Sequence, residues 1–183
     1  MILSFDTATD VATACVSSDG EVLGESASAG RSVGAQRLLD DVHGLLDRAG
    51  MAPADLDLIV AGTGPGTFTG LRIGLATARA LGFALGVPVR GVSTLTALRV
   101  PAEVDVACID ARRGEVFCSG PGIDPRAIDP EALAAAHIPP DDSPLHVPHA
   151  RHHAALHATA GPPEPCYLRA PDADRNLAMR AAG

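Results

Sequence analysis

Short runs of apolar residues at the start of the chain predict three β-strands. Residues 2–5 and 11–17 are small and apolar, as in buried strands. The Ser18-Asp19-Gly20 sequence, which precedes residues 21–28, is typical of a hairpin turn. The second and third strands are therefore expected to be neighbours in one sheet.

A three- and four-residue spacing of leucine, valine and alanine begins after these strands. It runs from Gly34 to Ala49 and predicts an amphipathic helix, with Ser32 as its N-cap and Gly50 as its C-terminal stop. The pattern then predicts, in chain order, a helical turn at residues 53–56, a buried strand at 57–62, a long helix at 69–86, a strand at 87–92 and a short helix at 94–100.

The long helix carries a small residue at every fourth position: Gly70, Gly74, Ala78, Gly82 and Gly86. Residues four apart share one helix face, and a glycine inside a helix costs about 0.5–1 kcal/mol relative to alanine. We therefore expect another backbone to pack closely against this face. The partner could be the helix's own sheet or a second helix or chain. Apolar residues on the other faces indicate that the helix is buried on more than one side.

Beyond residue 101 the pattern predicts a second, smaller lobe. Residues 104–110 and 114–118 are strand-like, whereas residues 120–165 are rich in Pro, Ala, His and Asp, and only residues 130–137 look helical there. We therefore divide the chain into a first lobe at residues 1–101 and a shortened second lobe at 102–183.

Composition narrows the classes of function. A net charge of -8, 3% aromatic residues and no tryptophan argue against direct tRNA binding. The absence of lysine excludes a phosphate loop of the Gly-Lys-Ser/Thr type. No long uncharged apolar run is present, so no membrane span is expected. Four widely spaced cysteines, predicted to be free thiols, indicate a cytoplasmic protein: Cys15, Cys108, Cys118 and Cys166.

The sequence GPGTFTGLRIG (Gly64–Gly74) resembles the signature of the TsaB (YeaZ) family, the non-catalytic partner of the enzyme that makes threonylcarbamoyladenosine in tRNA. Residues 2–9, 91–98, 109–117 and 164–169 are similar to other family segments, in the family order. The resemblance implies an actin-like α/β fold (ASKHA, ribonuclease H-like), here with a complete first lobe and a reduced second lobe.

The resemblance also implies partners. Family members pair with a TsaD-like catalytic subunit, help to form the surface on which a TsaE-like ATPase docks, and can form homodimers. The expected interface lies on the helices at residues 34–49 and 69–86. The residues assigned to it are Leu38, Asp41, Val42, Leu45, Gly70, Arg72, Ile73, Gly74, Thr77, Ala78 and Leu81.

Two turns match, in position, the phosphate-binding turns of actin-like ATPases. Asp6 and Thr7 end the first strand, and Asp110 ends the first strand of the second lobe. Ala8 stands where the first turn has glycine, and Arg112 with Arg113 stands where the second turn has glycines and a threonine. The changes favour an inherited scaffold without catalytic residues or a cofactor of its own.

A weak contact with ATP or ADP at a shared complex interface stays a prediction. Gly64 and Gly66 would contribute to it, because their loop leads into a helix N-terminus, which can hold an anion. The alternatives are an independent nucleotide-binding enzyme, either an ATPase or a small-molecule kinase, and a stand-alone self-associating regulator.

Six of the seven histidines lie between His137 and His157. His149, His153 and His157 are four residues apart and would share one helix face, which could hold a metal ion. A solvated, variable surface segment is the interpretation that we favour, so no metal site is expected.

Overall fold

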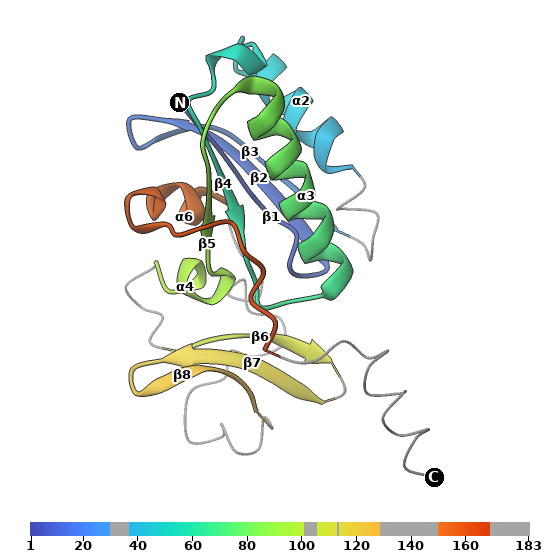
Figure 1. Ribbon diagram of the computed structural model, residues 1–183, viewed down its shortest axis with the longest axis vertical. Coiled ribbons are helices and arrows are strands. Elements are labelled where there is room, and N and C mark those ends of the chain that lie inside the picture. Colours follow the sequence, from blue (N-terminus) through green and yellow to red (C-terminus); the bar gives the residue numbers. More distant parts are fainter. Residues whose placement is uncertain (30–36, 101–105, 113, 129–149, 169–183) are drawn as a thin grey trace.

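The computed structural model describes residues 1–29, 37–100, 106–112, 114–128 and 150–168, and these form two β-sheets (Figure 1). The larger sheet has the strand order β3-β2-β1-β4-β5. β1 pairs antiparallel with β2 and parallel with β4, and the predicted hairpin turn at Asp19 and Gly20 joins β2 to its antiparallel neighbour β3. Its strands are β1 (Ile2–Asp6), β2 (Val11–Ser18), β3 (Glu21–Ala29), β4 (Leu58–Gly62) and β5 (Val89–Val92).

Two long helices, α2 (Leu38–Arg48) and α3 (Phe68–Leu85), cover one face of this sheet (Figure 1). Side chains alternate along β1, so Leu3 and Phe5 point toward these helices and are completely buried with Leu45. Gly50 follows α2 with a φ of +68°, which confirms its predicted role as a stop. The predicted turn is a 3-10 helix at Pro53–Asp55.

The opposite face is covered by α6 (Ala150–Ala155), a helix that the sequence pattern did not predict. The Ser4 hydroxyl donates to the Ala150 carbonyl at 2.6 Å, and Gly161 forms a backbone bridge with Gly91 of β5. The chain therefore returns to the first lobe after residue 149, so the boundary expected at residue 102 does not separate two continuous segments. Ser32, the beginning of the first predicted helix and residues 130–137 lie outside the described residues.

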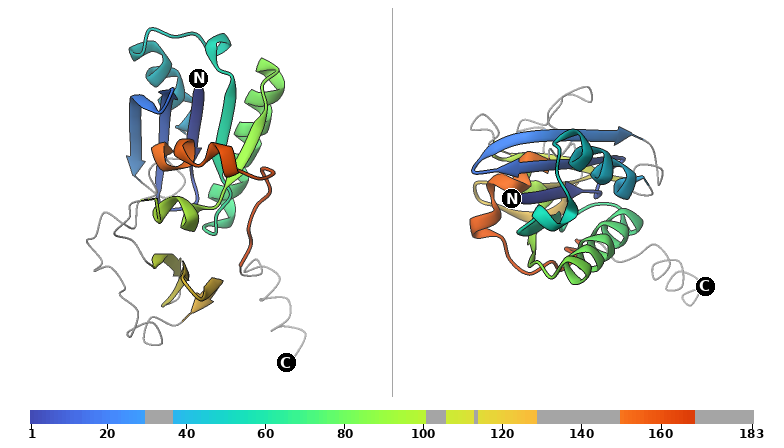
Figure 2. Two further views of the ribbon diagram at one scale, coloured as in Figure 1. Left: turned by 90° about the vertical axis from the view of Figure 1, so that its left-hand side faces the viewer. Right: turned by 90° about the horizontal axis from the view of Figure 1, so that it is seen from above.

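The second sheet lies beyond α4 (Thr94–Leu98) and contains β6 (Ala107–Arg112), β7 (Glu115–Gly120) and β8 (Ile123–Ile128) (Figure 2). Leu95 and Leu98 of α4 pack against Ile109 and Phe117 of this sheet. β8 was not predicted, because Pro125 and the exposed Asp124 and Arg126 interrupt any apolar alternation.

Within the part of the chain that the structure describes, no helix is long and apolar enough to cross a membrane.

Candidate functional site

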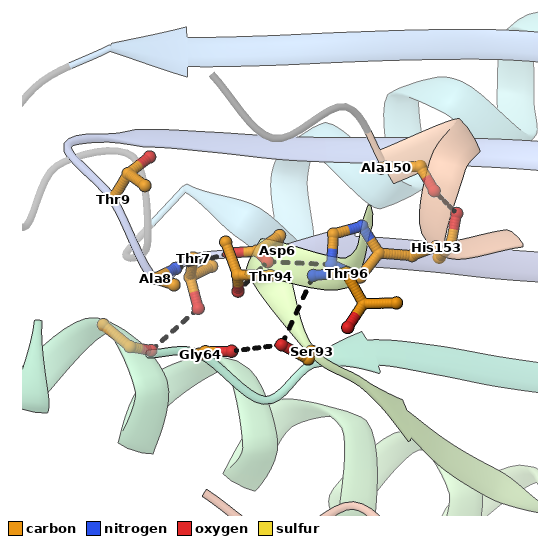
Figure 3. Close-up of polar contacts among 12 residues, drawn as sticks. Asp6, Thr7, Ala8, Thr9, Gly64, Ser93, Thr94, Thr96, Ala150 and His153 are labelled. Atoms are coloured by element: carbon orange, nitrogen blue, oxygen red, sulfur yellow. Dashed lines mark hydrogen bonds and ion pairs between the residues drawn. The ribbon is translucent and has the colours of Figure 1, made fainter. Parts of the chain in front are cut away.

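The carboxyl end of β1 holds a buried polar cluster centred on Asp6 (Figure 3). The Ala8 amide donates to Asp6 Oδ1 at 2.6 Å, and the Thr94 hydroxyl at the start of α4 donates to Oδ2 at 2.6 Å. His153 of α6 places its Nε2 atom 2.9 Å from the same Oδ2. Asp6, Thr94 and His153 are each 0% exposed, so three elements distant in sequence meet at one carboxylate.

The surroundings of Asp6 keep its carboxylate charged. Burial is the strongest single influence and raises the pKa of Asp6, since a charge is poorly solvated there. The hydrogen bond and charge of His153, with the hydrogen bonds from Thr94 and Ala8, outweigh burial and leave the pKa below its ordinary value. A buried, paired carboxylate of this kind holds elements together and has no oxygen facing solvent.

The glycine-rich stretch makes room for the Asp6-Thr7-Ala8 turn. A Cβ atom on Gly62 would lie 2.1 Å from Asp6 Oδ2, and one on Gly66 would lie 2.2 Å from the Ala8 carbonyl oxygen. Such distances are far inside van der Waals contact, so only glycine fits. The Thr67 amide donates to the Ala8 carbonyl at 2.7 Å and binds the turn to the loop before α3.

The same close approach continues along the inner face of α3. A Cβ atom on Gly70 would lie 2.0 Å from the Thr7 carbonyl oxygen, and one on Gly74 would lie 2.2 Å from Thr7 Oγ1. The Thr7 hydroxyl donates to the Gly70 carbonyl at 2.7 Å. Gly82 lies against Val89 of β5. The backbone that the stripe accommodates therefore belongs to the chain's own sheet.

This placement corrects part of the predicted interface. Gly70, Gly74 and Ala78 face the sheet, and Leu38, Val42 and Leu45 lie in the core beneath α2, so these six residues offer no surface to a partner. Their spacing signalled close packing, but a stripe of small residues does not say which backbone fills it. Of the other assigned residues, Arg72 is exposed, and the following are partly exposed: Asp41, Ile73, Thr77 and Leu81.

The first phosphate-like turn does not fit a metal-bound nucleotide. The Asp6 carboxylate is occupied by Ala8, Thr94 and His153, and Thr7 is 3% exposed with its hydroxyl bonded to Gly70. The backbone around Gly66 already lies against Ala8. Gly64 is also buried, and its carbonyl accepts the Thr94 amide at 2.8 Å. A nucleotide contact at a shared complex interface stays a prediction.

The second turn, at Asp110, is occupied by an arginine. Arg112 has a φ of +68°, and its amide donates to Asp110 Oδ1 at 2.6 Å. The guanidinium lies 3.1 Å from Asp110 Oδ2 and donates a second hydrogen bond to Asp10, close to the end of β1. The hydrogen bond with Asp10 contributes most to raising the pKa of Arg112. Arg112 thus connects the second sheet to the turn that holds Asp6.

The structure also corrects the interpretation of the histidine segment. His153 is fully buried against Asp6, whereas His157 is exposed and His149 lies outside the described residues. No group of three or more His, Cys, Asp or Glu side chains in the described ranges could hold a metal ion. His153 and Thr94 are the members of the cluster that sequence reasoning missed, because nothing in the pattern pairs residue 153 with strand β1.

The outer face of α3 is exposed along its length. Arg72, Ala76, Ala80 and Phe83 recur at three- and four-residue spacing, and all four are exposed. Phe83 is 93% exposed, although it is a large apolar residue. At the N-terminal end of the helix, the Arg72 guanidinium lies 3.9 Å above the ring of Phe68. We call Arg72, Ala76, Ala80 and Phe83 the outer stripe.

Comparison with known proteins places this arrangement in a family. Residues 25–125 match the model described as TsaD, tRNA N6-adenosine threonylcarbamoyltransferase. The chain is 36% identical over 122 residues to the tRNA threonylcarbamoyladenosine biosynthesis protein TsaB of Escherichia coli, a match that covers 63% of this chain and 52% of that protein. The chain belongs to the TsaB/YeaZ family.

Further similarities agree with TsaB/YeaZ membership. YeaZ from Pseudomonas aeruginosa superposes with a TM-score of 0.75 at 26% identity, covering 91% of this chain and 99% of that chain. An uncharacterized protein of Mycobacterium tuberculosis is 42% identical over 164 residues, which is 86% of this chain and 75% of that protein. The predicted actin-like α/β fold is confirmed.

Proposed function

We propose that this chain is a non-catalytic subunit in the biosynthesis of threonylcarbamoyladenosine in tRNA. The observation that carries the proposal is its membership of the TsaB/YeaZ family, in which the Escherichia coli relative is named as a biosynthesis protein of this pathway. In this role the chain pairs with a TsaD-like catalytic subunit and contributes to the surface on which a TsaE-like ATPase docks.

The Asp6 cluster supports a scaffold rather than an enzyme. An ATPase or kinase of actin-like fold needs a carboxylate at the end of β1 that can reach a metal-bound phosphate. Here that carboxylate is 0% exposed and is held by Thr94 and His153. The polar groups that could have supported phosphate chemistry are used to join β1, α4 and α6.

The outer stripe is the surface that we assign to the partner. Phe83 supplies an exposed apolar side chain, and phenylalanine is among the aromatic residues that are enriched at the core of protein–protein interfaces. The charged residues of α3, Arg72 and Arg79, are both basic. A partner with acidic residues around an apolar pocket would therefore complement this face. A second copy of the chain, whose α2 carries Asp40 and Asp41, is the competing occupant.

Reconstitution tests the proposal. The purified chain is incubated with threonylcarbamoyl-adenylate and tRNA, alone and together with TsaD-like and TsaE-like proteins, and modified adenosine is measured. We expect product only when the TsaD-like subunit is present, and more product when this chain is added to it. Product formed by the chain alone would show an enzyme. A TsaD-like protein that neither binds the chain nor responds to it would contradict the pairing.

Direct titration of the chain with ATP and ADP separates the scaffold from the alternative enzyme. We expect no saturable binding to the isolated chain. Binding that requires magnesium and disappears in Asp6→Asn, with the fold retained, would favour the independent ATPase or kinase.

A further inference from the structure

Two buried cysteines stand opposite each other on neighbouring strands of the second sheet. Cys108 of β6 and Cys118 of β7 are direct cross-strand partners, and both are free thiols. They are 1% and 0% exposed and share a face with apolar residues of the same sheet: Val106, Val116, Ile123 and Ile128. Neither residue belongs to the Asp6 cluster or to the outer stripe.

The cross-strand register of the two cysteines brings their Cα atoms to a separation that a disulfide can span. Directly opposed residues of antiparallel strands have Cα atoms about 4.5 or 5.5 Å apart, depending on their hydrogen bonding. Disulfides form at Cα separations of about 4.4–6.8 Å and Cβ separations of about 3.5–4.5 Å, provided that the Cβ atoms do not point apart. Cys108 and Cys118 are directly opposed on one sheet face, so their Cα separation lies in this range, and closing the bond needs only a small approach of Cβ atoms that are ordinarily about 4.5–5.5 Å apart in such pairs.

We propose that Cys108 and Cys118 are a redox-active dithiol that closes to an intrachain disulfide by exchange with a low-molecular-weight disulfide. One thiolate attacks a sulfur of the reagent, which forms a mixed disulfide and releases one thiol. The second thiolate attacks the bonded cysteine sulfur, which forms the Cys108–Cys118 bond and releases the second thiol. Two protein thiols are oxidised and one reagent disulfide is reduced to two thiols, so the electrons balance.

The other cysteines lack such a partner position. Cys15 stands opposite Glu25 in the larger sheet, and Cys166 lies in the segment after α6 and is partly exposed. Burial is the main cause that raises the pKa of Cys108 to about 11, and Cys118 adds to it. The pair is therefore protonated near neutral pH, and its exchange is slow in the closed sheet and faster at alkaline pH, where more thiolate is present.

The bond would pin the strand that carries Arg112. Cys108 precedes Asp110 on β6, and Arg112 at the end of that strand bonds to Asp10 beside the first-lobe turn. Closing a short loop within an existing strand pair restricts the unfolded chain. We expect the disulfide to raise the melting temperature by about 4–8 °C in a chain of this size.

Tryptic mapping tests the proposal on the full chain. Arg112 and Arg113 lie between the two cysteines, so trypsin separates them into peptides 100–112 and 114–126. The protein is equilibrated at alkaline pH in a glutathione buffer poised toward the oxidised form, alkylated and digested without reduction. We expect these two peptides to be linked, two thiols to be lost, and the melting temperature to rise. Reduction should reverse all three changes.

Cysteine variants assign the bond. Cys108→Ala and Cys118→Ala should each abolish the linked peptides and the rise in melting temperature, whereas Cys15→Ala and Cys166→Ala should keep both. Repeating the oxidation in mild urea separates slow access from absent reactivity, because it opens the sheet transiently. Four free thiols in wild type under both conditions, a persistent glutathione adduct on Cys108, or a linkage to Cys166 would overturn the proposal.

Discussion

The two faces of α3 carry opposite kinds of surface. On the inner face, glycine and alanine bring the helix backbone into contact with Thr7 and Val89, and no side chain reaches solvent from Gly74 or Ala78. On the outer face, Phe83 is 93% exposed. The glycine pattern therefore reflects packing within the chain, and we propose that a partner binds the exposed residues between the glycines.

The inner face of α3 packs against the Asp6-Thr7-Ala8 turn, and His153 contacts the Asp6 carboxylate in that turn. Replacing His153 with Ala leaves the Asp6 carboxylate buried without the ring nitrogen that lies 2.9 Å from its Oδ2 atom, so the free energy of unfolding should fall by about 3–5 kcal/mol. Denaturant titration measures the loss. His43→Ala is the matched control, since the side chain of His43 is 74% exposed, and it should change stability by less than about 0.5 kcal/mol. An equal loss of unfolding free energy in the two variants would show that His153 does not stabilise the Asp6 cluster.

A larger side chain at Gly74 breaks the inner face directly. Its Cβ atom would lie 2.2 Å from Thr7 Oγ1, so Gly74→Leu should destabilise the isolated chain by about 3 kcal/mol through overpacking. Ala76→Leu on the exposed side of the same helix is the control and should leave the melting temperature nearly unchanged. A stable Gly74→Leu chain that only loses its partner would mean that the stripe is an interface after all.

Lowering the pH should reduce the free energy of unfolding, because it protonates the Asp6 carboxylate. The folded-state pKa of Asp6 is lowered, so the stability that it provides is present above the pKa of an unfolded aspartate, about 4, and is lost as pH falls through the folded-state pKa. One proton taken up on unfolding gives a slope of about 1.4 kcal/mol per pH unit. Between the folded-state and unfolded-state pKa values of Asp6, the free energy of unfolding should change less steeply with pH in Asp6→Asn than in the wild type. An unchanged slope would mean that another carboxylate controls acid stability.

The sequence was informative wherever local pattern determines structure. The apolar runs predicted all five strands of the larger sheet. The leucine spacing of α2 and the glycines of α3 predicted both long helices that cover one face of that sheet. It was less informative where distant segments meet. α6 has only six residues, too few to show a helical period, and its contact with Asp6 joins residues 147 positions apart.

The prediction of the interface was partly wrong for the same reason, because a sequence pattern does not show which distant segments meet. Spacing identified a close approach at Gly70 and Gly74 but could not distinguish Thr7 of the same chain from a partner helix. Exposure, which only the folded arrangement provides, moves the assignment to Phe83 and its neighbours.

The most direct test of the central claim is the affinity of a Phe83→Ala chain for the TsaD-like subunit. Leu23→Ala on β3 is the matched control, because Leu23 is a 42% exposed apolar residue outside α2 and α3. Calorimetry of binding is combined with thermal unfolding of each variant. We expect Phe83→Ala to lose about tenfold or more in affinity, equivalent to about 1.4 kcal/mol, with its melting temperature unchanged and with normal binding by Leu23→Ala. Wild-type affinity in Phe83→Ala, or an equal loss in both variants, would contradict the assignment of the outer stripe as the partner-binding face.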